Sequence, residues 1–178
     1  MQERLESAPS SATQLDDETL NFAQEVFELA RSGDAMHLGK LLQQGLPANL
    51  CDRKGDSLLM LASYHGHIDA VRLLLAHKAD PELRNNNGQT PIAGAAFKGN
   101  LPMIRLLLAH GADVDGASPD GKTALMMAAM FNRTEIVDYL LAHGARIDAK
   151  DLNGVTPLLA AKMTGALETV TQLMKFSA

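Results

Sequence analysis

The chain has 178 residues, of which 46% are hydrophobic and 4% aromatic, and it carries a formal net charge of −5. This is enough apolar material for a sizeable core, but the aromatic content is low for a conventional globular enzyme. Leu, Ala and Met supply most of the apolar residues, which predicts many short helices in close contact, because Ala lets helix backbones approach and Leu fills the space between them.

The distribution of charge and the single cysteine narrow the classes of function further. Residues 1–18 are acidic and leave a charge of only −1 for residues 19–178, so no basic stripe favours a nucleic-acid partner. Cys51 alone cannot form an intramolecular disulfide, and a cysteine-based metal site is disfavoured. No apolar run is long enough to span a membrane, and the start of the chain lacks an export pattern. We expect a cytoplasmic protein without nucleic-acid or membrane partners.

The first 18 residues are predicted to be a mobile acidic N-terminal segment that precedes a single folded domain of residues 19–178. The stretch from Ser7 to Ala12 has neither apolar periodicity nor a helix-capping pattern. We expect this segment to be mobile in the free protein.

Glycines recur with a period of 33 residues through the rest of the chain. One series is formed by Gly55, Gly88, Gly121 and Gly154, and another by Gly33, Gly66, Gly99, Asn132 and Gly165. Asn fits the second series because, after Gly, it best tolerates the positive φ of a helix-ending position. The period therefore reflects backbone geometry that each unit repeats.

Each period is predicted to hold a turn followed by two short amphipathic helices. The first helix starts after Thr90, Thr123 or Thr156, where Thr can cap the helix and a following Pro can occupy its first turn. The second helix has apolar spacing such as that of residues 136–141 and ends near a His-Gly-Ala sequence.

The elements Gly-x-Thr-Pro-Leu, Ala-Ala and Leu-Leu-x-x-Gly-Ala-Asp, repeated in a 33-residue frame, resemble the ankyrin repeat. The resemblance implies an all-α helix-turn-helix solenoid with short β-hairpin-like turns and about five repeats. The units are residues 19–51, 52–84, 85–117, 118–150 and 151–178. The arrangement is also similar to short stand-alone ankyrin-repeat proteins of bacteria.

The first and last units are predicted to be capping repeats, because an end repeat lacks a neighbour on one side and needs a polar outer face. On the first helix this face is formed by Glu18, Asn21, Glu25 and Glu28. On the last helix it is formed by Thr169, Thr171, Gln172 and Lys175.

The chain departs from the family at the position after Thr-Pro-Leu, where ankyrin repeats usually carry a His that hydrogen-bonds to neighbouring repeats. The residues there are Met60, Ala93, Met126 and Leu159. We therefore expect the polar ladder between repeats to be absent and packing to replace it, in a stack that is less rigid than a consensus array.

Residues 116–123 satisfy the pattern G-x-x-x-x-G-K-T of a phosphate-binding loop. Three features argue against nucleotide binding: Pro119 removes a backbone N–H, Asp120 would place a carboxylate beside phosphates, and no buried hydrophobic strand precedes Gly116. The repeat frame already accounts for the second Gly and the Thr of this pattern.

Three histidines share the period of the repeat: His77, His110 and His143. They cannot converge on one metal, because neighbouring repeats are about 8–10 Å apart and zinc needs each nitrogen at about 2 Å. We expect them to interact with the C-terminal ends of helices. His65 and His67 beside Asp69 are a weaker metal candidate and are interpreted as solvated turn residues.

No nucleophile elbow, H-E-x-x-H motif or carboxylate pair is present, so we expect no enzyme activity, cofactor, metal or small-molecule substrate.

One periodic set of residues is not required by the repeat. Thirteen positions into each unit stand Tyr64, Phe97, Met130 and Met163, and the next position holds His65, Lys98 and Phe131. In the ankyrin family these positions lie on the inner helix and face a concave groove in which partners dock. Aromatic and Met side chains there favour a protein-binding stripe, and the alternative is semi-buried packing at helix ends.

Polar residues at the hairpin tips are expected to tune specificity and association rate: Arg53, Lys54, Asp56, Asn86, Gln89 and Lys122. The function implied is a non-catalytic adaptor or regulator that is monomeric when free and binds a protein partner. Two alternatives are an inhibitor or host-directed effector that binds a target enzyme, and a nucleotide-dependent switch at residues 116–123.

Overall fold

The computed structural model describes residues 11–176, with side chains described from Asp17 onward. Within that range the chain forms ten helices: α1 (Ser11–Ser32), α2 (Ala35–Gln43), α3 (Leu58–Tyr64), α4 (Ile68–Ala76), α5 (Pro91–Lys98), α6 (Leu101–Ala109), α7 (Ala124–Met130), α8 (Thr134–Ala142), α9 (Pro157–Thr164) and α10 (Leu167–Phe176). The fold is the all-α repeat solenoid that the sequence predicts. Of the N-terminal segment that is predicted to be mobile, residues 1–18, the first ten lie outside the described residues.

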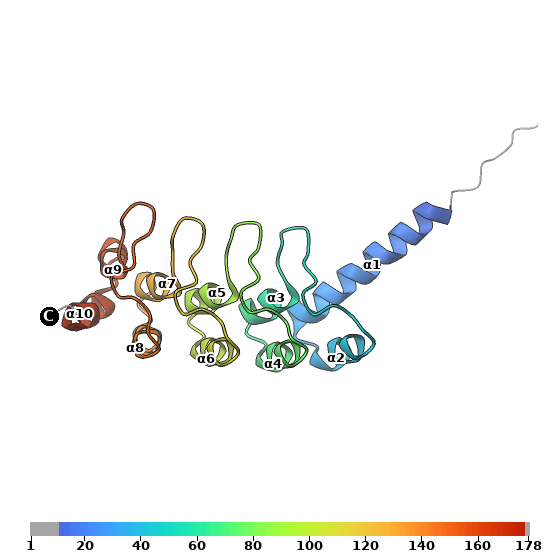
Figure 1. The fold of residues 1–178 in the computed structure, drawn as a ribbon, viewed down its shortest axis with the longest axis horizontal. Coiled ribbons are helices and arrows are strands. Elements are labelled where there is room, and N and C mark those ends of the chain that lie inside the picture. The colour runs from blue at the N-terminus through green and yellow to red at the C-terminus, as the bar shows by residue number, and fades with distance from the viewer. Residues whose placement is uncertain (1–10, 177–178) are drawn as a thin grey trace, which may run out of the picture.

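Two rows of helices run along the stack (Figure 1). The inner helices α3, α5, α7 and α9 follow one another beneath the hairpin loops, and the C-terminal part of α1 packs on α3. The outer helices α2, α4, α6, α8 and α10 form the second row. Each inner helix contacts the inner helices on either side of it, so each repeat is stabilised by its neighbours.

The periodic residues make the turns that the sequence predicts. Each hairpin is closed by a backbone hydrogen bond, such as that from Asp52 N to Asp56 O at 3.0 Å and that from Ser118 N to Lys122 O at 3.0 Å. Asn132 has a φ of 55°, which confirms that it takes the helix-ending position of the glycine series. Lys78 stands where the later His-Gly-Ala sequences have Gly111 and Gly144, and it takes the same left-handed conformation, with a φ of 63°.

The predicted helix caps are confirmed at two of three positions. The Thr123 and Thr156 hydroxyls accept hydrogen bonds from Met126 N at 3.3 Å and Leu159 N at 3.2 Å. Thr90 occupies the same position, but its buried Oγ1 has no hydrogen-bond partner among the described residues, so its predicted capping bond is wrong. Pro91 occupies the first turn of α5, where its fixed φ favours the start of a helix.

The core follows the composition of the chain. The same position of each inner helix is a fully buried alanine: Ala62, Ala95, Ala128 and Ala161. These small side chains allow neighbouring inner helices to approach, while fully buried Leu58, Ile92 and Leu125 fill the space around them.

The repeats are joined by polar contacts that the sequence analysis did not expect. A side-chain oxygen of one repeat accepts a hydrogen bond from a backbone N–H of the next at three successive interfaces: Asn49 from Asp80 at 2.8 Å, Glu82 from Asp113 at 2.9 Å, and Asp115 from Arg146 at 3.0 Å. We call Asn49, Glu82 and Asp115 the acceptor ladder. The prediction that packing alone joins the repeats is therefore wrong, because acceptors in the loops before the hairpins take over the role of the missing His.

Glu82 combines two effects within the acceptor ladder. Its carboxylate accepts the Asp113 N–H and is also partly buried, and this burial is the largest cause that raises the pKa of Glu82. The charges of Asp113 and Asp80 act in the same direction, whereas the hydrogen bond from Asp113 N lowers the pKa. Because the net pKa is raised in the folded state, ionised Glu82 opposes folding at neutral pH.

Replacing Glu82 with Gln is expected to keep or raise the thermal midpoint at neutral pH, because the amide oxygen can accept the same bond without carrying a charge. Glu82→Ala should instead lose about 1 kcal/mol, since Asp113 N–H loses its partner. The advantage of Gln should shrink as the pH falls through the raised pKa of Glu82, where the wild-type carboxyl becomes protonated. Thermal melts followed by circular dichroism check this, and equal losses in both variants would contradict it.

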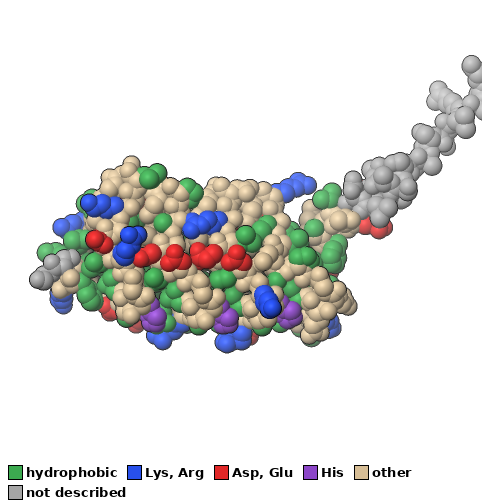
Figure 2. Space-filling model, in the orientation of Figure 1, with side chains coloured by type: hydrophobic (Ala, Val, Ile, Leu, Met, Phe, Trp, Pro, Cys, Tyr) green, Lys and Arg blue, Asp and Glu red, His purple; other side chains and the backbone are tan. Residues whose placement is uncertain are grey.

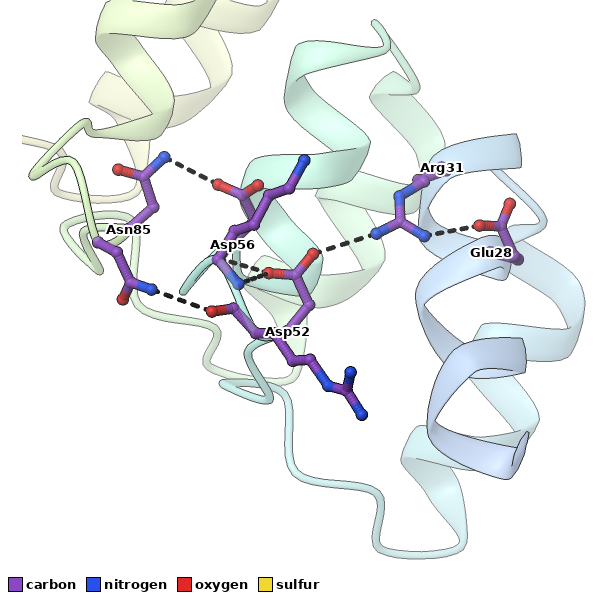
Figure 3. Close-up of polar contacts among 8 residues, drawn as sticks. Glu28, Arg31, Asp52, Asp56 and Asn85 are labelled. Atoms are coloured by element: carbon purple, nitrogen blue, oxygen red, sulfur yellow. Dashed lines mark hydrogen bonds and ion pairs between the residues drawn. The ribbon is translucent and has the colours of Figure 1, made fainter. Parts of the chain in front are cut away.

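A network of charged residues ties α1 to the first hairpin (Figure 3). The Arg31 guanidinium donates to Glu28 Oε1 at 2.6 Å and to Asp52 Oδ2 at 3.1 Å. The other oxygen of Asp52 accepts the backbone N–H groups of Lys54 at 2.8 Å and Asp56 at 3.0 Å. Asp52 therefore holds the shape of the hairpin and anchors the helix that precedes it.

The end repeats differ from their predicted form. Helix α1 begins at Ser11, so residues 11–18 belong to the same helix as the first repeat rather than to a separate segment. At the other end, Thr169 is fully buried and Gln172 donates to Thr134 O at 3.0 Å, so these residues face the preceding repeat rather than solvent. The exposed surface of the last repeat also carries large apolar side chains: Leu152, Leu159, Met163, Leu167, Met174 and Phe176. The predicted polar face of α10 is wrong for Thr169 and Gln172, which form hydrogen bonds to the fourth repeat, whereas Thr171 and Lys175 are exposed as predicted.

Candidate functional site

The residues predicted to bind a partner lie at the C-terminal ends of the inner helices. Tyr64 ends α3, Phe97 lies one residue before the end of α5, Met130 ends α7, and Met163 lies one residue before the end of α9. We call these four residues the inner-helix stripe. Their helices stand side by side in Figure 1, so the stripe crosses four neighbouring repeats.

Tyr64, Phe97 and Met130 each contact the following repeat in a regular pattern. The Lys98 ammonium lies 4.2 Å from the centre of the Tyr64 ring, and the Phe97 and Phe131 rings meet edge to face at 4.8 Å. The Thr164 hydroxyl donates to Met130 O at 2.9 Å. All three contacts join residues 34 positions apart, so the same step recurs along the stack.

The stripe is neither fully exposed nor part of the core. Tyr64 is 42% exposed, Phe131 41% and Met163 70%, whereas Phe97 and Met130 are half-buried. The predicted alternative of semi-buried packing therefore describes Phe97 and Met130, while the rings of Tyr64 and Phe131 keep a large accessible surface. Such a surface can contribute anchor area to a partner at little cost to the core.

A shallow depression of about 410 Å³ lies beside Tyr64. Its wall is formed by Tyr64, His65 and Gly66 from the end of the second repeat's inner helix, and by Lys98, Gly99, Asn100 and Pro102 from the third repeat. The His65 ring packs edge to face on Tyr64 at 5.7 Å. The structure thus brings together three of the predicted site residues, Tyr64, His65 and Lys98, in one place.

The predicted hairpin-tip residues are placed differently from one another. The side chains of Arg53 and Lys54 are exposed, and Asn86 binds their backbone carbonyls through its Nδ2 and N at 3.0 and 2.9 Å. Asp56 and Gln89 both accept from Asn85 Nδ2 at 2.9 Å, so these two side chains join and shape the hairpins. Arg53 and Lys54 are therefore the tip residues whose charged groups are most available to a partner.

The loop of residues 116–123 uses its polar groups within the repeat. Lys122 Nζ pairs with Asp120 at 2.8 Å, and the hydrogen bonds from Lys122 and from the Ser118 hydroxyl lower the pKa of Asp120 to about 2. The Thr123 hydroxyl, which is buried, accepts the Met126 N–H that starts α7. The ammonium and hydroxyl that would contact a phosphate thus already have partners.

The periodic histidines cap the outer helices, as predicted. These residues are His77, His110 and His143. In each of them, Nδ1 lies 2.8–3.0 Å from the carbonyl oxygen of the residue four positions earlier. His67 Nε2 lies 2.8 Å from Arg31 O, so this residue joins the first two repeats. In the part of the chain that the structure describes, no group of three or more metal-ligating side chains is present.

Two features of the structure were missed by the sequence analysis. Arg133 follows Phe131 and Asn132 in the turn after α7, and a Cβ placed on Gly99 would lie 2.9 Å from Arg133 Nε, so this guanidinium lies against the Lys98–Gly99 turn. The acidic loops after the outer helices are the second, and Figure 2 shows acidic side chains in a row across the repeats on the face that it draws. The 33-residue spacing of Asn49, Glu82 and Asp115 was visible in the sequence and could have indicated the second feature.

None of the helices over residues 11–176 is both long and apolar enough to cross a membrane. The comparison with protein families gives a match to ankyrin repeats, in a family model of three copies, over residues 26–118 and again over residues 114–178. Together these matches cover well over half of the chain and include all the inner helices.

Three known proteins illustrate the similarity. A Pseudomonas aeruginosa protein named for its ankyrin repeats is 65% identical over 64 residues, which are 36% of this chain and 37% of that protein. Mouse 2-5A-dependent ribonuclease is 37% identical over 86 residues, 48% of this chain and 11% of the relative. Human ankyrin repeat domain-containing protein 63 is 44% identical over 52 residues, 29% of this chain and 14% of the relative. The matched part is thus well under two thirds of each relative's length.

Proposed function

The chain belongs to the ankyrin-repeat family, and we propose that it is a non-catalytic adaptor or regulator that binds a protein partner through the inner-helix stripe. Ankyrin repeats are generally protein–protein interaction modules. The observation that supports this site is the series of contacts that Tyr64, Phe97 and Met130 make with the following repeats, in which the rings of Tyr64 and Phe131 stay exposed. Arg53 and Lys54 at the hairpin tips extend the proposed surface.

Two finer statements belong to the same proposal. The protein is proposed to act in the cytoplasm, which suits a chain whose one cysteine, Cys51, is free and exposed. The kind of partner distinguishes an adaptor from an inhibitor or effector. Capture of an enzyme whose activity falls when this protein binds it would favour an inhibitor or effector.

The proposal is tested by a double substitution, Tyr64→Ala with Phe97→Ala. We expect capture of the protein partner from native lysate to weaken by at least about tenfold, because aromatic anchors often contribute 2 kcal/mol or more each. Quantitative mass spectrometry of the captured proteins measures this, and a thermal melt of the same variant measures its folding. Both residues retain contact with solvent, so the loss of stability should be smaller than the loss caused by a fully buried leucine.

A matched control removes two exposed side chains from the outer helices, Met36→Ala with Arg72→Ala. This control should capture the partner as the wild type does. If the aromatic variant instead unfolds, while its folded fraction captures the same partners equally well, the stripe is core packing and the binding site lies elsewhere.

A further inference from the structure

Charge is segregated along the repeats in a way that bears on the identity of the partner. The four segments that form the inner helices and the turns after them are residues 58–67, 91–100, 124–133 and 157–166. They contain three Lys or Arg residues, Lys98, Arg133 and Lys162, and no Asp or Glu. The whole chain, by contrast, has 21 acidic and 16 basic residues. These segments thus carry a net positive charge in a protein of negative net charge, while the first turns of the outer helices that follow carry Asp69, Glu135 and Glu168.

The acidic residues lie at the other end of the same helices. A short turn joins each inner helix to the outer helix that follows, so the two run in opposite directions and the loop after the outer helix returns to the N-terminal end of the inner helices. These loops carry Asp80, Glu82, Asp113, Asp115 and Asp148 together with Lys78, Arg84, Arg146 and Lys150. Charges of both signs are therefore mixed at this edge, which makes it a less favourable place for an anionic ligand than the C-terminal ends of the inner helices.

Lys98 and Arg133 are the two cations that lie beside the ring pair of Phe97 and Phe131. Arg133 lies against Gly99, the residue after Lys98, and each cation is adjacent in sequence or in the turn to Phe97 or Phe131. Among the residues that the structure describes, neither Lys98 nor Arg133 forms an ion pair. The Lys98 ammonium lies over the face of the Tyr64 ring, an arrangement that leaves its positive charge available to an anion.

We propose that the partner segment is an acidic peptide with at least one large apolar side chain, whose carboxylates pair with Lys98 and Arg133 while the apolar side chain packs on Phe131 and Phe97. The depression beside Tyr64 and His65, which Lys98 also lines, accepts the neighbouring residue of the peptide. Apolar contact and charge are both required, since exposed ion pairs alone contribute little. This proposal rests on the proposed function and names the chemistry of the segment that the inner-helix stripe binds.

The test starts from a random dodecapeptide library displayed on phage and selected on the full chain at physiological salt. We expect the enriched peptides to carry more Asp and Glu than Lys and Arg and to contain Leu or an aromatic residue. One enriched peptide, labelled with fluorescein, is then titrated by fluorescence anisotropy. Its affinity should fall at least about tenfold for Lys98→Glu with Arg133→Glu, and should fall as salt is added.

The control makes the same change of charge on the outer helices, with Lys40→Glu and Arg72→Glu, and should bind the peptide as the wild type does. Enrichment of neutral or basic peptides, or no enrichment over the starting library, overturns the proposal. Equal binding of the two charge-reversed variants also overturns it, and so does equal competition by polyglutamate or single-stranded DNA, which lack the apolar side chain. If partner capture is lost with Tyr64→Ala and Phe97→Ala but survives the reversal at Lys98 and Arg133, the proposed function stands and the acidic peptide does not.

Discussion

Replacement of Leu107 by Ala is expected to lower the free energy of unfolding by about 2–5 kcal/mol. Leu107 is fully buried in α6, the outer helix of the central repeat, and lies within the continuous hydrophobic core. Because each repeat is stabilised by those beside it, the cavity left by the shorter side chain should weaken the neighbouring repeats as well. Urea unfolding followed by circular dichroism should therefore show a lower midpoint for the array as a whole.

Leu167→Ala is the matched control for this substitution. Leu167 is 75% exposed at the start of α10, so its truncation removes few core contacts and should leave the urea midpoint nearly unchanged. If the Leu107→Ala protein unfolded at the same urea midpoint as the wild type, the result would contradict the placement of this side chain of α6 in the core.

Gly121→Ala is expected to cost about 3 kcal/mol, because it adds backbone strain to a steric clash. Gly121 has a φ of 85°, and an added Cβ would lie 2.8 Å from Asp151 Cα in the next hairpin. The neighbouring hydrogen bond from Leu152 N to Asp120 O, at 2.9 Å, would be pushed apart by the same movement. The measurement is again the free energy of unfolding in urea.

Gly144→Ala separates strain from the clash. Gly144 has a φ of 91°, but nothing lies within 4 Å of an added Cβ, so only the conformational cost of about 1–2 kcal/mol should appear. Equal losses in the two variants would show that the close approach of the third and fourth hairpins, which hold Gly121 and Asp151, does not limit stability.

The solenoid could be predicted because its geometry is local. Positive φ at Gly33, Gly66 and Asn132 requires residues that tolerate it, so the sequence shows the turns directly, and the position of Thr123 marks the start of a helix. These requirements are the same in every repeat. A period of 33 residues therefore carries most of the information about the fold.

Contacts between repeats could be predicted less well, because they depend on side-chain direction and on which neighbour is present. The acceptor role of Asp115 needs the Arg146 N–H to point toward it, and Thr169 is buried because Asn132 bonds to its N and Oγ1 at 3.0 and 3.1 Å. In the sequence, a polar residue of the last helix that faces the preceding repeat has the same pattern as one that faces solvent. The sequence alone does not distinguish these two environments.

The position of each candidate site residue within its repeat could be predicted from the sequence, but its burial and contacts could not. The period placed Tyr64 and Phe97 on one line, but it could not show that Phe97 is half-buried against Phe131 while Tyr64 remains 42% exposed. Arg133 has no equivalent in the other repeats, so a search for periodic residues passed over it. Its closeness to Gly99 follows from the three-dimensional stacking of two turns.

The acceptor ladder also has a mechanical consequence. Its hydrogen bonds cross from one repeat to the next and none spans two interfaces, so a force applied to the ends of the stack is carried by the interfaces in series. Each interface then bears the whole force, and the total extension is the sum of the small openings between repeats. A partner that contacts several repeats along the inner-helix stripe would act in parallel with these bonds and make the stack stiffer.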